Sequence, residues 1–179
     1  MTNKEKALAL INTFTTGDTE KAKELLAPCY IQHNLAFGTG ADAFVAAVAG
    51  LAQSPVKTTV NNIRAFEDGD KVFLQTVYNF AGAGEQVGFD VFRFDTDGKI
   101  AEHWDNLAAK AEQGITMVYN KTHMVLADGD YGLACSEGTF GRVPTTYYDL
   151  FRVENGFIAE HWDVMETLAD KDTWQNQNG

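Results

Sequence analysis

Phe89-Asp90-Val91-Phe92-Arg93-Phe94, followed by Gly98-Lys99-Ile100-Ala101-Glu102-His103-Trp104-Asp105, is a stretch that this chain contains twice. It returns as Tyr148-Asp149-Leu150-Phe151-Arg152-Val153 followed by Gly156-Phe157-Ile158-Ala159-Glu160-His161-Trp162-Asp163. The offset changes only from 60 (Asp68 to Asp128) to 58 (Glu102 to Glu160), so about fifty residues are duplicated. Roughly the first sixty residues have no second copy. We interpret the chain as one complete α+β unit followed by the β-rich half of a second.

Helical patterns occupy the unrepeated part of the chain. Apolar residues recur at i, i+3, i+4 and i+7 over residues 4–14, and a capped second helix over 18–26 ends before Pro28. A short strand or a bend is expected at 30–34. An alanine-rich third helix over 41–52 buries one apolar side.

From residue 57 the period changes to two, with β-branched and aromatic residues separated by Gly and Asp turns. We predict four strands at 58–66, 72–80, 86–94 and 99–106, a helical remnant at 107–113, and four repeated strands at 115–127, 131–138, 145–153 and 157–167. The expected fold is α+β, with three helices packed on a curved antiparallel sheet and then a four-stranded half-repeat. The predicted domains are 1–110 and 111–179.

Charge and composition limit the classes of partner. The net charge is -11, with 14 basic and 25 acidic residues, which argues against nucleic acid and anionic membrane surfaces as partners. No signal peptide or membrane span is evident, so a soluble cytoplasmic protein is expected. Cys29 and Cys135 lie in unrelated surroundings and are expected to be free thiols.

The motif Tyr30-Ile31-Gln32-His33-Asn34, together with the repeated strands, resembles the SnoaL-like polyketide cyclase branch of the nuclear transport factor 2-like superfamily. The resemblance implies a cystatin-like cone with a pocket between sheet and helices, and usually a homodimer formed through the outer faces of the sheets. Some relatives carry two units in tandem, but the second unit here lacks most of its helices. Because a bare apolar sheet face is unfavourable, we expect the second sheet to cover the first, as an internal pseudo-dimer or by exchange between chains.

Strand alternation sorts the candidate site residues, because side chains two residues apart share a face. Asp90 and Phe92 share one face, and Glu102 and Trp104 oppose the face of His103. The resemblance suggests that Asp90, Phe92, Glu102 and Trp104 line the cone. A carboxylate among aromatic rings has a raised pKa, as a general acid or base requires.

Each carboxylate also has a purely structural interpretation. Asp90 can bond to the backbone or to a neighbouring Tyr or Arg, and Glu102 can pair with Arg64 or Arg93. His33 is a candidate proton shuttle or a histidine that is hydrogen-bonded at a strand end.

The candidate substrate-binding residues are Tyr30, Asn34, Phe92 and Trp104. Tyr30 and Asn34 are expected to donate hydrogen bonds to a substrate carbonyl, in the manner of an oxyanion site.

His103 and Asp105 form a His-carboxylate pair that His161 and Asp163 repeat. With four histidines in the chain, a metal site would need two sheets brought together, so no metal is expected. We interpret the two pairs as polar contacts between sheets, with direct catalysis as the alternative. The second copy has no equivalent of Tyr30 or the residues beside it, so activity is expected in residues 1–110.

The function that follows from the resemblance is cofactor-free acid/base chemistry on a small, mostly apolar molecule: aldol-type cyclisation, isomerisation, dehydration or epoxide hydrolysis. The alternative is a non-catalytic ligand-binding or dimerisation module, because fold does not fix function. A rearranged or engineered gene with little activity is a third interpretation of the shortened second unit.

Overall fold

The computed structural model describes residues 1–108 and 117–178, and its contacts divide the chain into two compact units. The first unit is Met1–Asp105 with Ala169–Gly179, and the second is Asn106–Leu168. The tail after the second sheet therefore belongs to the first unit, whereas the sequence assigned it to the half-repeat.

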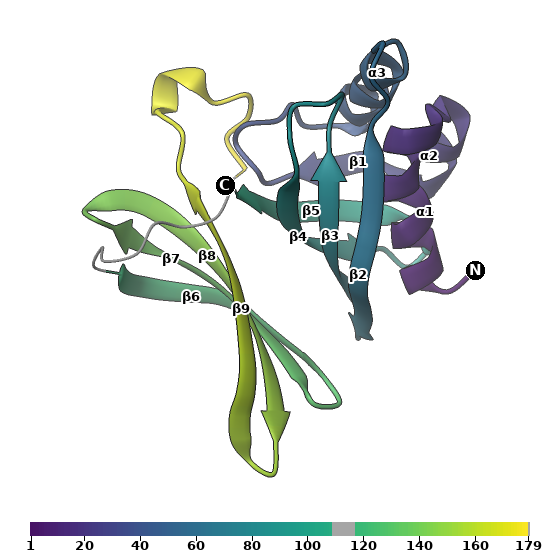
Figure 1. The fold of residues 1–179 in the computed structure, drawn as a ribbon. Coiled ribbons are helices and arrows are strands. Elements are labelled where there is room, and N and C mark those ends of the chain that lie inside the picture. Colours follow the sequence, from purple (N-terminus) through teal and green to yellow (C-terminus); the bar gives the residue numbers. More distant parts are fainter. Residues whose placement is uncertain (109–116, 179) are drawn as a thin grey trace. The chain divides into compact units, whose positions relative to one another are not determined.

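The first unit contains three helices and a five-stranded sheet, one strand more than the sequence predicts for the sheet (Figure 1). Its elements are α1 (Asn3–Thr16), α2 (Thr19–Leu25), β1 (Leu26–Gln32), α3 (Ala41–Ala52), β2 (Thr59–Asp68), β3 (Lys71–Asn79), β4 (Gln86–Phe94), β5 (Ile100–Ala108) and the short tail helix η1 (Lys171–Thr173). The strand order is β1-β5-β4-β3-β2. The α+β class and the cone-like arrangement predicted from the sequence are confirmed.

The extra strand, β1, begins earlier than the predicted strand and pairs in parallel with β5. Pro28 lies within it and has no N–H to donate, which an edge strand tolerates because one side of its backbone is unpaired. β1 thus brings the Tyr30-to-Asn34 motif beside β5, the strand that carries His103 and Asp105.

Helix α1 has complete signals at both ends. The Thr2 side chain accepts from the backbone N–H of Glu5, and the Glu5 side chain accepts from the backbone N–H of Thr2. Gly17 closes the helix with a left-handed φ of 73°. The buried side of α1 includes Leu10 and Ile11, and the helix packs against β2 and β3.

Two glycines should respond oppositely to substitution by alanine. Gly17→Ala forces a left-handed residue to carry a Cβ that would lie 2.7 Å from the Cβ of Ala52, so we expect a loss of about 1–2 kcal/mol of stability. Gly50 lies inside α3, and a Cβ added there would have no neighbouring atom within 4 Å, so Gly50→Ala should add about 0.5–1 kcal/mol. Urea unfolding of both variants checks the signs, and a Gly17→Ala protein of unchanged stability would contradict the assignment of this helix end.

The second unit is a sheet of four antiparallel strands in the order β6-β7-β8-β9. These are β6 (Met117–Asp128), β7 (Tyr131–Phe140), β8 (Val143–Glu154) and β9 (Phe157–Thr167). Of the predicted helical remnant at 107–113, Leu107 and Ala108 belong to β5 and the rest lies outside the described residues.

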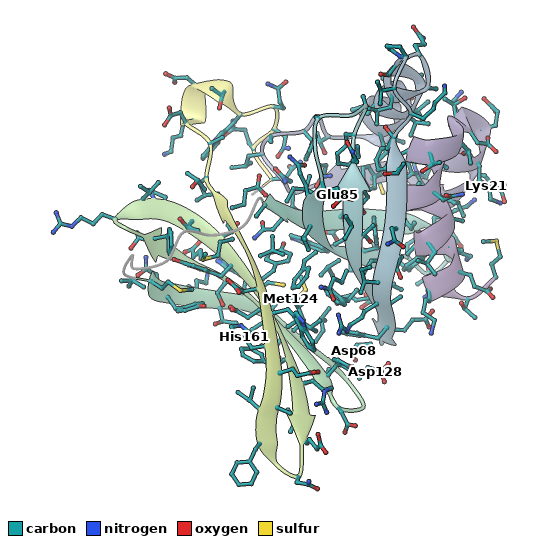
Figure 2. All side chains as sticks on the ribbon, viewed as in Figure 1. Lys21, Asp68, Glu85, Met124, Asp128 and His161 are labelled. Carbon is teal, nitrogen blue, oxygen red and sulfur yellow. The ribbon has the colours of Figure 1, made fainter. Side chains whose placement is uncertain are left out.

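The repeat extends to the turns. Asp68 and Asp128, labelled in Figure 2, are the last residues of β2 and β6, the repeated strands that occupy corresponding positions in the two copies. The glycine after each is left-handed, with φ of 59° at Gly69 and 55° at Gly129. The two copies therefore share backbone geometry as well as sequence.

Within the described residues, no helix is both long and apolar enough to cross a membrane. Both cysteines are free; Cys135 is buried, whereas Cys29 is exposed.

Candidate acid/base site

Asp90 lies at the centre of a buried polar cluster on the helix-facing side of the first sheet. The Tyr78 hydroxyl donates to its Oδ2 at 2.8 Å, and its Oδ1 is 3.1 Å from Nε2 of His103. Phe92 stacks on the His103 ring with centroids 4.2 Å apart. Burial, and then the nearby Asp90 charge, raise the pKa of Tyr78 well above its usual value, so the phenol stays a hydrogen-bond donor.

Two hydrogen-bond donors contact Nδ1 of His103, the ring nitrogen that faces away from Asp90. Its Nδ1 is 3.0 Å from Nε2 of Gln32 and 3.2 Å from the Tyr30 hydroxyl. The Gln32 side-chain oxygen accepts from the backbone N–H of Asn34 at 2.9 Å, which turns the amide nitrogen toward the ring. An amide nitrogen only donates, so Nδ1 accepts and the proton of the neutral imidazole is on Nε2, facing Asp90.

Asp105 completes the cluster and has one oxygen without a hydrogen bond. Its Oδ2 accepts from Nδ2 of Asn34 at 2.9 Å, whereas its buried Oδ1 has no hydrogen bond and lies 3.8 Å from Nε2 of His103. The residue is 5% exposed. Burial raises the pKa of Asp105 to about 6; the nearby Asp90 charge reinforces this shift, and the hydrogen bond from Asn34 opposes it.

The raised pKa predicts how stability changes with pH. The pKa of Asp105 is about 6 in the folded protein and 3.8 in the unfolded chain. Protonated Asp105 therefore stabilises the fold below pH 3.8, and this stabilisation is lost as the pH rises through about 6. Asp105→Asn removes this titration, so the stability of the variant relative to the original chain should rise by about 2 kcal/mol between pH ~4 and ~7.5. Urea unfolding at both pH values measures this difference. Parallel pH profiles for the two proteins would contradict a raised pKa.

The predicted faces of β5 are wrong. His103 and Asp105 point to the interior with Asp90, while Glu102 and Trp104 lie on the opposite side of the strand. Glu102 pairs with Arg93, which alternation places on the face of β4 opposite Asp90. His103 and Asp105 therefore do not lie on the outer face, where a contact between sheets was expected.

Glu102 is unsuited to proton transfer near neutral pH because its pKa is lowered. Partial burial raises its pKa, but hydrogen bonds from His33 and Arg93 outweigh that effect and lower it overall. His33 donates from Nε2 to Glu102 at 2.8 Å and stacks on Trp104 with centroids 4.3 Å apart. The predicted His33, Glu102 and Trp104 thus form a second group, separate from the Asp90 cluster.

The second sheet repeats part of this geometry. His161, labelled in Figure 2, is 2.8 Å from Asp149, and it stacks on Phe151 with centroids 4.5 Å apart. The Tyr119 hydroxyl also donates to Asp149, at 3.2 Å. The His161 side chain is 41% exposed, against 7% for His103, and the repeated sequence has no counterpart of Gln32. The proposed interface role of His161 and Asp163 stays a prediction.

Sequence reasoning placed Tyr30, Asn34, Asp90 and Phe92 in the site, and the structure brings them together. It did not assign chemistry to Gln32 or Tyr78, and it preferred an interface role for His103 and Asp105. One signal was available: Arg93 lies on the face opposite Asp90, so its pairing with Glu102 turns His103 inward.

The described residues contain no group of three or more His, Cys, Asp or Glu side chains that could hold a metal ion. The polar groups of the site are instead bonded to one another, with Oδ1 of Asp105 as the exception.

The first unit matches a known protein family. The model of the SnoaL-like domain family matches residues 7–103. An NTF2-like protein of unknown function from Cytophaga hutchinsonii is similar in structure, with a TM-score of 0.52 and 16% identity over 60% of this chain and 91% of that one.

Two further solved structures also have TM-scores of 0.52. An LEH-like epoxide hydrolase from M. tuberculosis is 19% identical over 59% of this chain and 82% of its own. A cystatin-fold protein from Novosphingobium aromaticivorans is 16% identical over 59% of this chain and 97% of its own. These likenesses show the fold. No curated protein matches the chain. The family match covers more than half of the chain, including Asp90 and His103, and the protein therefore belongs to the SnoaL-like domain family.

Proposed function

We propose that the first unit catalyses cofactor-free proton transfer on a small, mostly apolar molecule, with Asp105 as the group that gives and takes the proton. The observation that carries the proposal is Oδ1 of Asp105, a buried carboxylate oxygen without a hydrogen bond in a group whose pKa is raised to about 6. A group with a pKa near the working pH is suited to general acid/base catalysis.

The neighbours of Asp105 have distinct roles in this proposal. Asp90 accepts from His103 and Tyr78 and so fixes the imidazole in one tautomer. The hydrogen bond from Asn34 opposes the effect of burial on Asp105 and so keeps both forms of that carboxyl accessible. Tyr30 has a pKa raised by burial and by the charges of Asp105 and Asp90, so it remains protonated and suited to steady a developing oxyanion.

Two reaction classes fit a single carboxyl group that returns its proton. In isomerisation of a β,γ-unsaturated ketone, the Asp105 carboxylate removes the proton beside the carbonyl and returns it at the far alkene carbon. In epoxide hydrolysis, protonated Asp105 gives its proton to the ring oxygen while water adds, and a proton of that water restores the acid. The epoxide hydrolase among the structural neighbours makes epoxides the first class to test, alongside aldol-type cyclisation and dehydration.

The experiment is turnover of cyclohexene oxide and of a β,γ-unsaturated cyclohexenone by the full chain, with products followed by mass spectrometry. We expect product formation above the buffer rate in at least one reaction, with a rate that changes near pH 6. Saturable binding of both compounds without turnover would instead support the non-catalytic binding module. A cytoplasmic location and a homodimer or internal pseudo-dimer stay predictions.

A further inference from the structure

The C-terminal tail binds the segment between β1 and α3. In Figure 1 the yellow tail turns toward the blue segment that precedes α3. Nδ2 of Asn176 donates to two backbone carbonyls of that segment, Asn34 at 3.1 Å and Phe37 at 2.9 Å. Asn176 is 8% exposed although both of its sequence neighbours are exposed. Loss of the Asn176 side chain would leave the carbonyl oxygens of Asn34 and Phe37 without these hydrogen bonds, which is unfavourable for buried groups. The contact is therefore specific.

Asn178 makes a second set of contacts with the same segment. Its Nδ2 donates to the backbone carbonyl of Gln32 at 3.2 Å and to Oγ1 of Thr39 at 3.0 Å. Its own carbonyl accepts from Nδ1 of His33 at 2.6 Å, and its N–H donates to Oδ1 of Asn176 at 2.9 Å. The two asparagines are thus joined to each other as well as to the segment.

Two of the residues bound by the tail have side chains that hold the acid/base cluster. Asn178 bonds the carbonyl of Gln32, whose side chain donates to His103. Asn176 bonds the carbonyl of Asn34, whose side chain donates to Asp105. We infer that Asn176 and Asn178 are positioning residues that set the Gln32 and Asn34 amides against the proposed proton-transfer groups. This inference rests on the proposed function.

His33 has a place in the same arrangement. Its Nδ1 faces the Asn178 carbonyl and its Nε2 faces the Glu102 carboxylate, and both partners are acceptors. The ring therefore links the tail to β5 through its two nitrogens. His33 supports the tail and lies outside the Asp90 cluster.

The two tail asparagines lie beyond residues 7–103, the range of the family match. They come from the stretch that follows the second sheet, so the half-repeat connects the family unit to its own positioning residues. The inference thus gives the tail a role in the proposed site that residues 7–103 alone do not supply.

The test is the Asn176→Asp substitution in the full chain, which replaces the donor with an acceptor of the same shape opposite two carbonyl oxygens. Gln177→Glu is the matched control, because it adds the same charge at an exposed neighbouring position. Carboxyl-carbon NMR follows the titration of Asp105, with Asp105→Asn identifying its signal. The hydrogen bond from Asn34 lowers the pKa of Asp105, and Asn176→Asp should displace the Asn34 amide. We therefore expect the pKa of Asp105 to rise by roughly half a unit or more in Asn176→Asp and to stay unchanged in the control.

Amide hydrogen exchange at Gln175, whose N–H donates to the Leu35 carbonyl, reports whether the tail is released. Faster exchange with an unchanged Asp105 titration would overturn the inference. If Asn176→Asp does not fold, Asn176→Ala removes the donors without adding charge, and the same two readouts apply. In the original chain, titration of Asp105 near 4 would count against the proposed function itself, whatever the tail variants do.

Discussion

Asp105→Asn is expected to lower turnover by about 10²–10⁴-fold, the usual contribution of a general acid or base, while it makes the protein more stable at neutral pH. The substitution keeps the shape of the side chain, and its oxygen can still accept from Asn34. It removes only the proton that the reaction needs. A gain in stability with a loss of rate separates a catalytic role from a structural one, because loss of a structural residue lowers both.

Asp163→Asn is the matched control for this experiment. Asp163 has the corresponding place in the repeat, but it is exposed, and the proposal assigns it no part in the chemistry. Turnover by Asp163→Asn should equal that of the original chain. Equal losses in both variants would contradict the placement of the activity in the first unit.

Phe92→Ala is expected to have the largest effect on stability, about 3–5 kcal/mol. Phe92 is fully buried and stacks on His103, so its loss leaves a cavity beside the cluster. Because the ring also fixes the orientation of the imidazole, turnover should fall even where the variant remains folded. Urea unfolding measures the first effect, and rates well below the unfolding midpoint measure the second.

Phe151→Ala gives the corresponding change in the second sheet. Phe151 stacks on His161 in similar geometry but is only half-buried, so we expect a smaller loss of about 1–2 kcal/mol and no change in rate. A loss at Phe151 as large as that at Phe92 would show that burial is not the source of the difference.

The elements of this fold could be predicted because each has a local signal. The apolar spacing of α1 and the alanine-rich α3 identified two helices, and the period-two strands with Asp-Gly turns identified both sheets. The full length of β1 could not be predicted. Its pairing with β5 is a contact between distant parts of the chain, which no local pattern encodes.

Only part of the candidate site could be predicted, because the rest also depends on contacts between distant parts of the chain. Alternation shows that Glu102 and His103 face opposite ways, but it does not show which of them faces the helices. The Arg93–Glu102 pair decides the matter, and it is visible only when two strands are considered together. The contacts of Asn176 and Asn178 with Asn34 and Gln32 join residues separated by 142 and 146 positions, so their role required the structure.

The central claim is that the first unit holds the His103 ring with Nδ1 accepting from Gln32 and Nε2 facing Asp90, beside a buried Asp105 with one oxygen that has no hydrogen bond. Multiple-bond nitrogen–proton NMR of the full chain measures this directly, since the four histidines can be assigned by single His→Gln substitutions. We predict that, at neutral pH, Nε2 of His103 carries the proton and Nδ1 carries none. A proton on Nδ1 of His103 would contradict the hydrogen-bond network from which the proposed chemistry is derived.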